Sequence, residues 1–225
     1  MIELKKRDVE EGGPVYVLHM QDGENRYNAG SIEALHKALD EFDAVEGDKA
    51  LVTVGEGKFY SNGLDLDWLM SPDAQEFPNF MPDVHRLFGR VLFNNAPTAA
   101  AINGHAFAGG AMLASAHDFR VMRVDRGYFC IPEVDLDLPL TLGMHATLQA
   151  RIPPQPLHEA VVTGKRWGAD ELVERNMIEG TATEPEVLNT AISWASAQAH
   201  HCGETLSTMK RNLYPHAFEV LLSTP

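Results

Sequence analysis

Two glycine-containing segments directly follow apolar runs that are typical of buried strands. One segment covers residues 55–63 and the other covers residues 103–110. Open α/β sheets bind ligands at the carboxyl ends of their strands, so each segment could direct a backbone N–H at the same substrate oxygen. Two such donors would form an oxyanion hole. Each segment taken alone is more typical of a tight turn, because glycine is common in turns.

The spacing of apolar residues predicts the elements that must position these segments. The predicted strands cover residues 15–20, 50–54, 98–102, 119–123 and 128–131. The predicted helices cover residues 28–43, 80–91, 111–116, 141–151, 157–162, 187–200 and 205–222. The strand at 50–54 does not alternate between apolar and polar residues, as expected of a strand covered on both faces of a parallel sheet. This order predicts one α/β domain with a helical C-terminal region.

The composition predicts a packed core and argues against several classes of partner. Of the 225 residues, 44% are hydrophobic and 22% are charged, which is ordinary for a globular protein. The formal net charge of -14 argues against a nucleic acid partner, and phosphates of any ligand would need a local basic or amide-rich site. Cys130 and Cys202 lie far apart and indicate neither a disulfide framework nor a zinc site.

The chain shows no pattern that is typical of secretion or of membrane insertion. Residues 1–13 lack the apolar segment of a signal peptide. Residues 97–116 are the most apolar stretch, but their glycines together with Asn103 and His105 make them unsuited to a bilayer span. The final residues do not form an SKL peroxisomal signal. We therefore expect a cytoplasmic protein with no membrane partner.

Five segments in the same order resemble motifs of the crotonase family. Residues 58–66 (KFYSNGLDL) are similar to F-(S/C)-(A/S)-G-x-D-L, and residues 103–114 (NGHAFAGGAMLA) are similar to N-G-x-A-x-G-G-G-x-x-L-A. Residues 117–121 (HDFRV) resemble C-D-x-R, and residues 129–136 (FCIPEVDL) resemble F-x-x-P-E-x-x-x-G. Residues 163–173 (TGKRWGADELV) resemble T-G-x-x-x-x-A-x-E-A. The ordered set covers nearly the whole chain and is far more specific than any single motif.

The resemblance implies a single crotonase-like domain over residues 1–225. It implies a ββα spiral core up to about residue 155 and a helical trimerisation region over about 156–225. A homotrimer or a dimer of trimers that binds an acyl-CoA thioester, with no separate cofactor, is also implied. By position, the N–H groups of Leu64 and Gly109 match the family's oxyanion hole, and Glu133 matches its second catalytic glutamate.

Met112 stands where the family carries its first catalytic glutamate. Hydration of a 2-enoyl thioester uses two carboxylates, and a thioether replaces neither of them. Moving a double bond from C3 to C2 needs only one, and Met112 would keep the surroundings of Glu133 apolar and raise its pKa. The resemblance is therefore closest to Δ3,Δ2-enoyl-CoA isomerases. A 2-enoyl-CoA hydratase, another crotonase reaction and a non-catalytic acyl-CoA binding protein are the alternatives.

Further substrate contacts follow from position in the family. Arg26 precedes the first predicted helix and is expected at the CoA phosphates, although an exposed loop arginine explains it equally well. Backbone groups of Ser61 and Asn62 are expected on the adenine side, and Asn62 departs from the small residue that the family usually has there. His105 is expected to pack within its loop.

Two other kinds of chemistry are not supported by the residue spacing. Ser61 lacks the G-x-S-x-G elbow of a serine hydrolase. Acidic residues alternate at positions 65 and 67, and again at 133, 135 and 137, but neither set has the spacing of an EF-hand or a zinc site. We therefore expect no metal ion.

Overall fold

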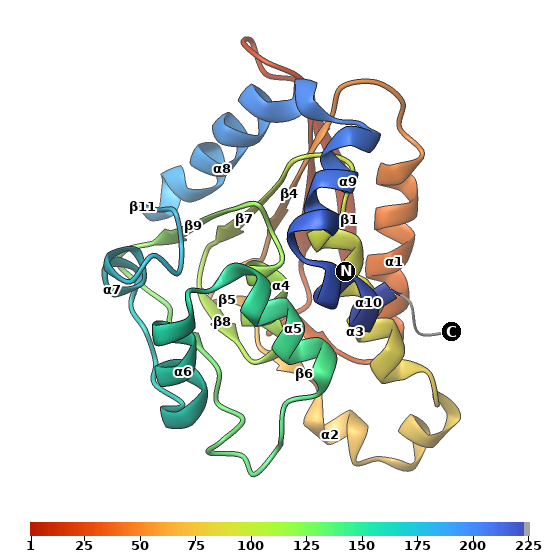
Figure 1. The fold of residues 1–225 in the computed structure, drawn as a ribbon, viewed down its shortest axis with the longest axis vertical. Coiled ribbons are helices and arrows are strands. Elements are labelled where there is room, and N and C mark those ends of the chain that lie inside the picture. The colour runs from red at the N-terminus through yellow and green to blue at the C-terminus, as the bar shows by residue number, and fades with distance from the viewer. Residues whose placement is uncertain (223–225) are drawn as a thin grey trace.

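A six-stranded sheet runs through the molecule in the order β1-β2-β4-β7-β9-β11 (Figure 1). In this computed structural model, which describes residues 1–222, β1 pairs with β2 in antiparallel fashion and the other neighbours are parallel. The six strands are β1 (Ile2–Arg7), β2 (Val15–Met20), β4 (Ala50–Val54), β7 (Thr98–Ile102), β9 (Phe119–Arg123) and β11 (Gly180–Ala182). Because β4 and β7 are parallel neighbours, their carboxyl ends lie side by side.

Two small sheets are built from short strands that follow β2, β4, β7 and β9 in the chain. One has the order β10-β8-β5, and the other pairs β3 with β6 in parallel. Their strands are β3 (Arg26–Tyr27), β5 (Phe59–Ser61), β6 (Gly63–Leu64), β8 (His105–Phe107) and β10 (Phe129–Cys130). The chain therefore passes repeatedly from a strand of the main sheet to a short strand and then to a helix, which is the expected ββα spiral of the crotonase fold.

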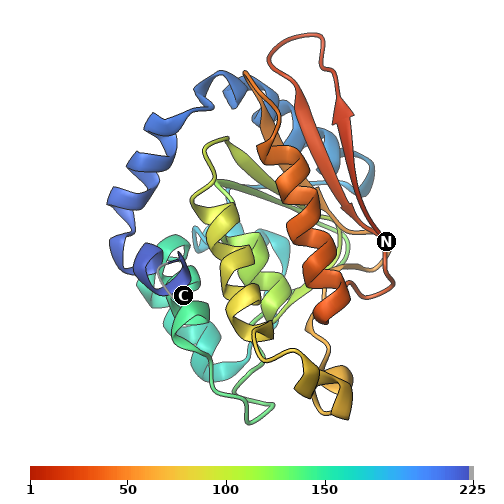
Figure 2. The same ribbon diagram turned by 90° about the vertical axis from the view of Figure 1, so that its right-hand side faces the viewer.

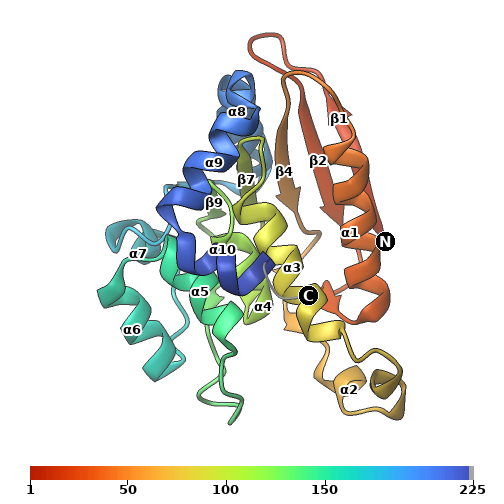
Figure 3. The same cartoon turned by 45° about the vertical axis from the view of Figure 1, so that its right-hand side comes forward.

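Ten α-helices surround these sheets in the described part of the chain. They are α1 (Ala29–Asp43), α2 (Leu66–Leu69), α3 (Phe80–Leu92), α4 (Gly109–Ser115), α5 (Leu142–Arg151), α6 (Pro154–Thr163), α7 (Ala169–Glu174), α8 (Glu184–Gln198), α9 (Glu204–Leu213) and α10 (Pro215–Leu222). Figure 2 shows α1 and α3 side by side on the outside of the core. In Figure 3, α10 lies against α3 and α5.

Different helices cover the two faces of the main sheet. Val52 on β4 packs with Val187 and Ala191 of α8, whereas Leu51 belongs to the larger core formed with α1, α3 and α4. Every residue of β4 is buried, because successive side chains point to opposite faces and both faces are covered. This double coverage explains the lack of alternation in the sequence of β4.

The structure differs from the sequence-based expectation at both ends of the chain. The helix expected over 205–222 is broken, because Pro215 has no N–H for a continuing helix and instead begins α10. The edge strand β1 was not predicted, since its charged residues resemble a surface segment. The expected helical region after residue 155 also supplies β11 to the main sheet. Residues 223–225 of that region lie outside the described residues.

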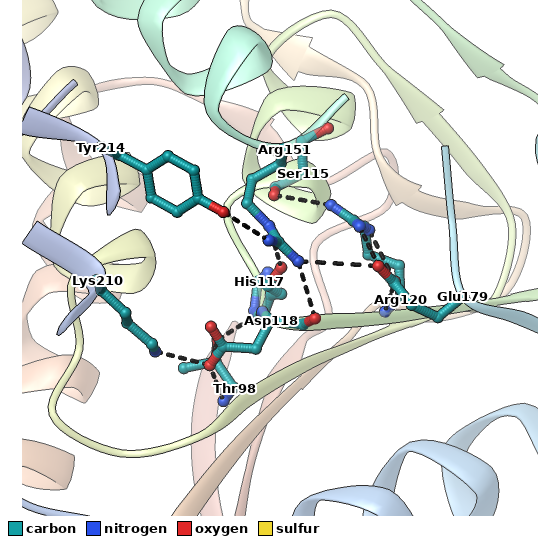
Figure 4. Close-up of polar contacts among 9 residues, drawn as sticks. All are labelled: Thr98, Ser115, His117, Asp118, Arg120, Arg151, Glu179, Lys210 and Tyr214. Atoms are coloured by element: carbon teal, nitrogen blue, oxygen red, sulfur yellow. Dashed lines mark hydrogen bonds and ion pairs between the residues drawn. The ribbon is translucent and has the colours of Figure 1, made fainter. Parts of the chain in front are cut away.

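A buried lysine attaches the C-terminal helices to the main sheet (Figure 4). Nζ of Lys210 on α9 donates to Oδ2 of Asp118 at 2.7 Å and to the carbonyl oxygens of Asn94 and Ala96 at 3.2 and 3.4 Å. The same carboxylate oxygen accepts from the backbone N–H of Thr98 at 2.9 Å. Since Thr98 begins β7 and Asp118 directly precedes β9, this ion pair connects α9 to two central strands.

A second group of charges lies beside the first (Figure 4). Nε of Arg120, a buried residue of β9, donates to Glu179 at 3.0 Å, and its Nη1 donates to the carbonyl of Ser115 at 3.2 Å. Arg151 of α5 donates to the carbonyl of Asp118 at 2.9 Å and to the hydroxyl of Tyr214 at 3.1 Å. These contacts hold the carboxyl end of α4 against β9 and connect α5 with the chain between α9 and α10.

Replacing Lys210 with methionine is expected to lower the free energy of unfolding by about 3 kcal/mol, because it leaves the Asp118 carboxylate without its cation. Urea unfolding of the wild type and Lys210→Met measures this change. The control is Lys5→Met, which removes an exposed pair with Glu3 and should change the free energy by about 0.5 kcal/mol or less. Equal effects of the two substitutions would contradict the role given to Lys210.

Candidate active site

The two glycine-containing segments meet at the carboxyl ends of β4 and β7. A methyl group built on Gly63 would lie 2.6 Å from the amide nitrogen of Gly109, which is closer than real carbon contacts. Gly63 also has a φ of 75°, a left-handed conformation that glycine adopts at little cost. The approach of the two segments therefore requires glycine at position 63.

The same close contact continues one residue further along α4. A methyl group built on Gly110 would lie 2.1 Å from the carbonyl oxygen of Ser61. Gly109 begins α4, so its N–H belongs to the first turn, where amides have no acceptor within the helix. Leu64 lies in β6 opposite Tyr27 of β3. The structure thus brings together the two segments that carry the expected donors, Leu64 and Gly109.

Glu133 lies just after β10, and one of its carboxylate oxygens is shielded from solvent. Its Oε2 is buried and has no hydrogen-bond partner among the described residues. Burial raises the pKa of Glu133 to about 7, because desolvation disfavours the charged form; the backbone N–H of Glu133 opposes this shift with a smaller effect. Both protonation states are therefore populated near neutral pH.

Glu133 lines a cavity of about 540 Å³. The apolar side chains in its wall are Ile131, Val134, Leu138, Pro139, Leu140, Val161 and Val162. Asp137 and His145 are the other polar residues that line this cavity. His145 was not expected from the sequence, because nothing in its spacing links a residue of α5 to Glu133. A carboxylate without a partner in an apolar cavity is suited to exchange a proton with a carbon acid.

Met112 lies within the hydrophobic core rather than on an open surface. It is fully buried on α4 and belongs to the same core cluster as Phe129 and Ile131, which precede Glu133. Its thioether has no proton to give and accepts hydrogen bonds only weakly. At this position of α4 the chain therefore has no second carboxylate.

Arg26 is surrounded by carboxylates. Its Nε donates to Glu24 at 2.7 Å, and its Nη1 lies 3.1 Å from Oδ2 of Asp67 and 3.7 Å from Oδ1 of Asp65. The hydrogen bond with Glu24 raises the pKa of Arg26, so the guanidinium stays charged. Nδ2 of Asn62 donates to the same Glu24 carboxylate at 2.9 Å. A phosphate that binds Arg26 would have to compete with these acidic neighbours.

The structure corrects the expectation for Ser61. A contact between its backbone and the adenine side of a ligand was expected, but Ser61 is 0% exposed and offers no surface to a ligand in this structure. Its side chain binds neighbouring backbone groups instead, because β5 runs beneath the start of α4. The burial could not be read from the sequence, where Ser61 lies in a polar, glycine-containing segment.

His105 packs among aromatic rings, in agreement with the loop-packing role expected for it. Its ring lies 5.2 Å from that of Phe59, 5.1 Å from that of Phe107 and 5.7 Å from that of Tyr128, measured between centroids. Burial lowers the pKa of His105, and the charge of Arg166 lowers it further. A neutral imidazole within this aromatic group is consistent with packing.

Residues 1–222 offer neither a metal-binding cluster nor a membrane-spanning helix. This range contains no group of three or more His, Cys, Asp or Glu residues placed to hold a metal ion. No helix within it has the length and the apolar character needed to cross a bilayer. The cytoplasmic location stays a prediction.

Known proteins resemble this chain over nearly its whole length. Enoyl-CoA delta isomerase 2, peroxisomal, of Arabidopsis thaliana is 29% identical, with 98% of this chain and 95% of that protein covered. Enoyl-CoA delta isomerase 3 of the same plant is also 29% identical, with 96% of this chain and 92% of that protein covered.

Solved structures share the fold at lower identity. An apo Mtb enoyl-CoA isomerase superposes with a TM-score of 0.86 at 23% identity, covering 99% of this chain and 94% of that one. An enoyl-CoA hydratase from Mycobacterium ulcerans gives a TM-score of 0.84 at 23% identity, covering 98% and 95%. The sequence model of the enoyl-CoA hydratase/isomerase family matches residues 10–222. This chain therefore belongs to the enoyl-CoA hydratase/isomerase family.

Proposed function

We propose that the protein is a Δ3,Δ2-enoyl-CoA isomerase in which Glu133 moves the proton. The observation that carries this proposal is the buried, unpartnered Oε2 of Glu133 and its pKa of about 7. A base with a pKa near the working pH is ionised often enough to accept a proton, and its conjugate acid is strong enough to return it.

The reaction consists of two proton transfers through one carboxylate. The Glu133 carboxylate takes a proton from C2 of a 3-enoyl thioester, and the electron pair moves onto the thioester oxygen to form a dienolate. The N–H groups of Leu64 and Gly109 donate to this oxygen and stabilise its charge. The protonated Glu133 then gives the proton to C4, and the double bond lies between C2 and C3. No proton, water or electron is gained or lost overall.

Met112 supports isomerisation over hydration. Water addition requires one group to orient the water and another to deliver the C2 proton, and Met112 supplies no carboxylate for the first task. The names of the two Arabidopsis relatives agree with this preference.

Substrate binding and assembly complete the proposal. The thioester belongs to an acyl-CoA, whose phosphates approach Arg26 and whose adenine side approaches Asn62. Rearrangement of the bonds that Arg26 makes with Glu24 and Asp67 would free the guanidinium for a phosphate. We also propose the homotrimer, or dimer of trimers, that the crotonase resemblance implies.

Glu133→Gln should lower kcat for a 3-enoyl-CoA by about 10³-fold, because the amide accepts no proton at neutral pH. Conversion is followed by high-performance liquid chromatography of the 2-enoyl product. Glu41→Gln, a substitution at an exposed position of α1, serves as the control and should retain wild-type activity. Wild-type rates for Glu133→Gln would reject Glu133 as the base.

The same assay separates the alternative functions. If the protein is a hydratase, the wild type will convert a 2-enoyl-CoA to the hydroxy product faster than it isomerises a 3-enoyl-CoA. A non-catalytic binding protein would be stabilised against heat by CoA esters without any turnover, since a ligand that binds only the folded state raises its stability. Either result would overturn the isomerase assignment.

Glu133→Gln is also expected to raise the melting temperature at pH 8 but not at pH 4.5. The pKa of Glu133 is about 7 in the folded state, above its ordinary value of 4.5, so the unfolded chain loses this proton first. Stability of the wild type therefore falls as pH rises between these values, whereas glutamine has no such loss. Calorimetric scans of both proteins at the two pH values measure the difference. The same difference at both pH values would contradict the desolvation of Glu133.

A further inference from the structure

The buried hydroxyl of Ser61 joins its own segment to the segment just before β3, beside the proposed oxyanion hole. Its Oγ donates to the carbonyl of Asn25 at 2.8 Å and accepts from the N–H of Gly63 at 3.2 Å. Asn25 returns the contact, because its Nδ2 donates to the carbonyl of Tyr60 at 3.0 Å. Since Ser61 is fully enclosed, no solvent water reaches its side chain. The pair of side chains therefore holds the two segments in one register.

Both proposed donors depend on this register. Asn25 leads directly into β3, which pairs with β6 so that Tyr27 lies opposite Leu64. On its other side, the carbonyl of Ser61 lies so close to Gly110 that a methyl group there would come within 2.1 Å. A shift of Ser61 would thus move β6 and the start of α4 relative to each other.

A hydroxyl group is well suited to this place because it donates and accepts at the same time. Its acceptor side binds the N–H of Gly63, whose left-handed turn directs the next amide, that of Leu64. Alanine at position 61 would leave the Asn25 carbonyl and the Gly63 N–H without this partner in a buried environment. The turn at Gly63 would then lose the contact that holds it.

We propose that Ser61 is a positioning residue, which aligns the N–H groups of Leu64 and Gly109 for the enolate oxygen without touching the substrate. This inference rests on the proposed function and names a residue on which the rate of that reaction depends. A small displacement of such donors slows the reaction strongly, since a misplacement of about 1 Å can lower a rate about 10²-fold.

Steady-state kinetics of Ser61→Ala give the first test. We expect kcat to fall about 10-fold or more, while KM stays within about 2-fold of wild type, because the donors act mainly on the transition state. The pH at the midpoint of the kcat profile should not change, since Glu133 is untouched. Wild-type kcat in Ser61→Ala would overturn the inference.

Ser196→Ala is the matched control. Ser196 of α8 is equally enclosed, at 1% exposure, and its Oγ also joins another segment by donating to the carbonyls of Gly13 at 2.8 Å and Glu11 at 3.3 Å. Its substitution removes a buried bridge without touching either glycine-containing segment, so kcat should stay at the wild-type value. An equal fall of kcat in both variants would assign the effect of Ser61 to general stability and overturn the inference.

Infrared difference spectra of bound hexanoyl-CoA, labelled with ¹³C at the thioester carbonyl, give a second test. This saturated probe does not isomerise, and hydrogen bonds from the donors should lower its carbonyl frequency. We expect a smaller lowering in Ser61→Ala than in the wild type and in Ser196→Ala. A full shift in Ser61→Ala would overturn only the inference about Ser61. Absence of a shift in the wild type would overturn the proposed oxyanion hole as well.

Ser61→Cys keeps the test available if Ser61→Ala does not fold. Its thiol retains a weaker donor and acceptor at the same position. We expect its kcat and its carbonyl shift to be smaller than those of the wild type, with KM unchanged. Wild-type values of both quantities would overturn the inference.

Discussion

Backbone packs directly on backbone where residues 61–63 meet the start of α4. No side chain fits between Gly63 and the amide of Gly109, and none fits between Gly110 and the carbonyl of Ser61. This contact is possible because β4 and β7 are parallel neighbours, so that the segments leaving them meet at one edge of the sheet. The other end of α4 is held by Arg120, which donates to the carbonyl of Ser115. The proposed anion site thus rests on a helix fixed at both ends.

The proposed oxyanion hole would stabilise a negative charge, whereas the surroundings of the Glu133 carboxylate oppose its charge. Desolvation raises its pKa to about 7, and no described group donates a hydrogen bond to Oε2. Such a group lowers stability at alkaline pH, which is a cost often found at reactive sites. The buried pair of Lys210 and Asp118 lies elsewhere and connects α9 to β7 and β9. The proposed base and this buried ion pair are therefore separate groups in the molecule.

The sequence predicted the main strands and the neighbourhood of the site better than it predicted individual contacts. Strands such as β4 are visible because both faces are covered and no polar residue interrupts them. The enclosure of Ser61 and the contacts of Arg26 with Asp65 and Asp67 come from residues distant in sequence, so local patterns did not contain them. His145 lines the same cavity as Glu133 for the same reason. The break before Pro215 was visible in the sequence, but the apolar spacing on both sides of it suggested one helix.

The proposed reaction depends most on Glu133 removing a proton from the carbon next to the thioester. Exchange of the C2 protons of hexanoyl-CoA in D₂O, followed by mass spectrometry, isolates this step because a saturated thioester undergoes no later step. We expect exchange by the wild type, faster as pH rises through about 7, where Glu133 ionises. We expect no exchange above the uncatalysed rate with Glu133→Gln. Equal exchange by both proteins would rule out Glu133 as the group that removes the proton.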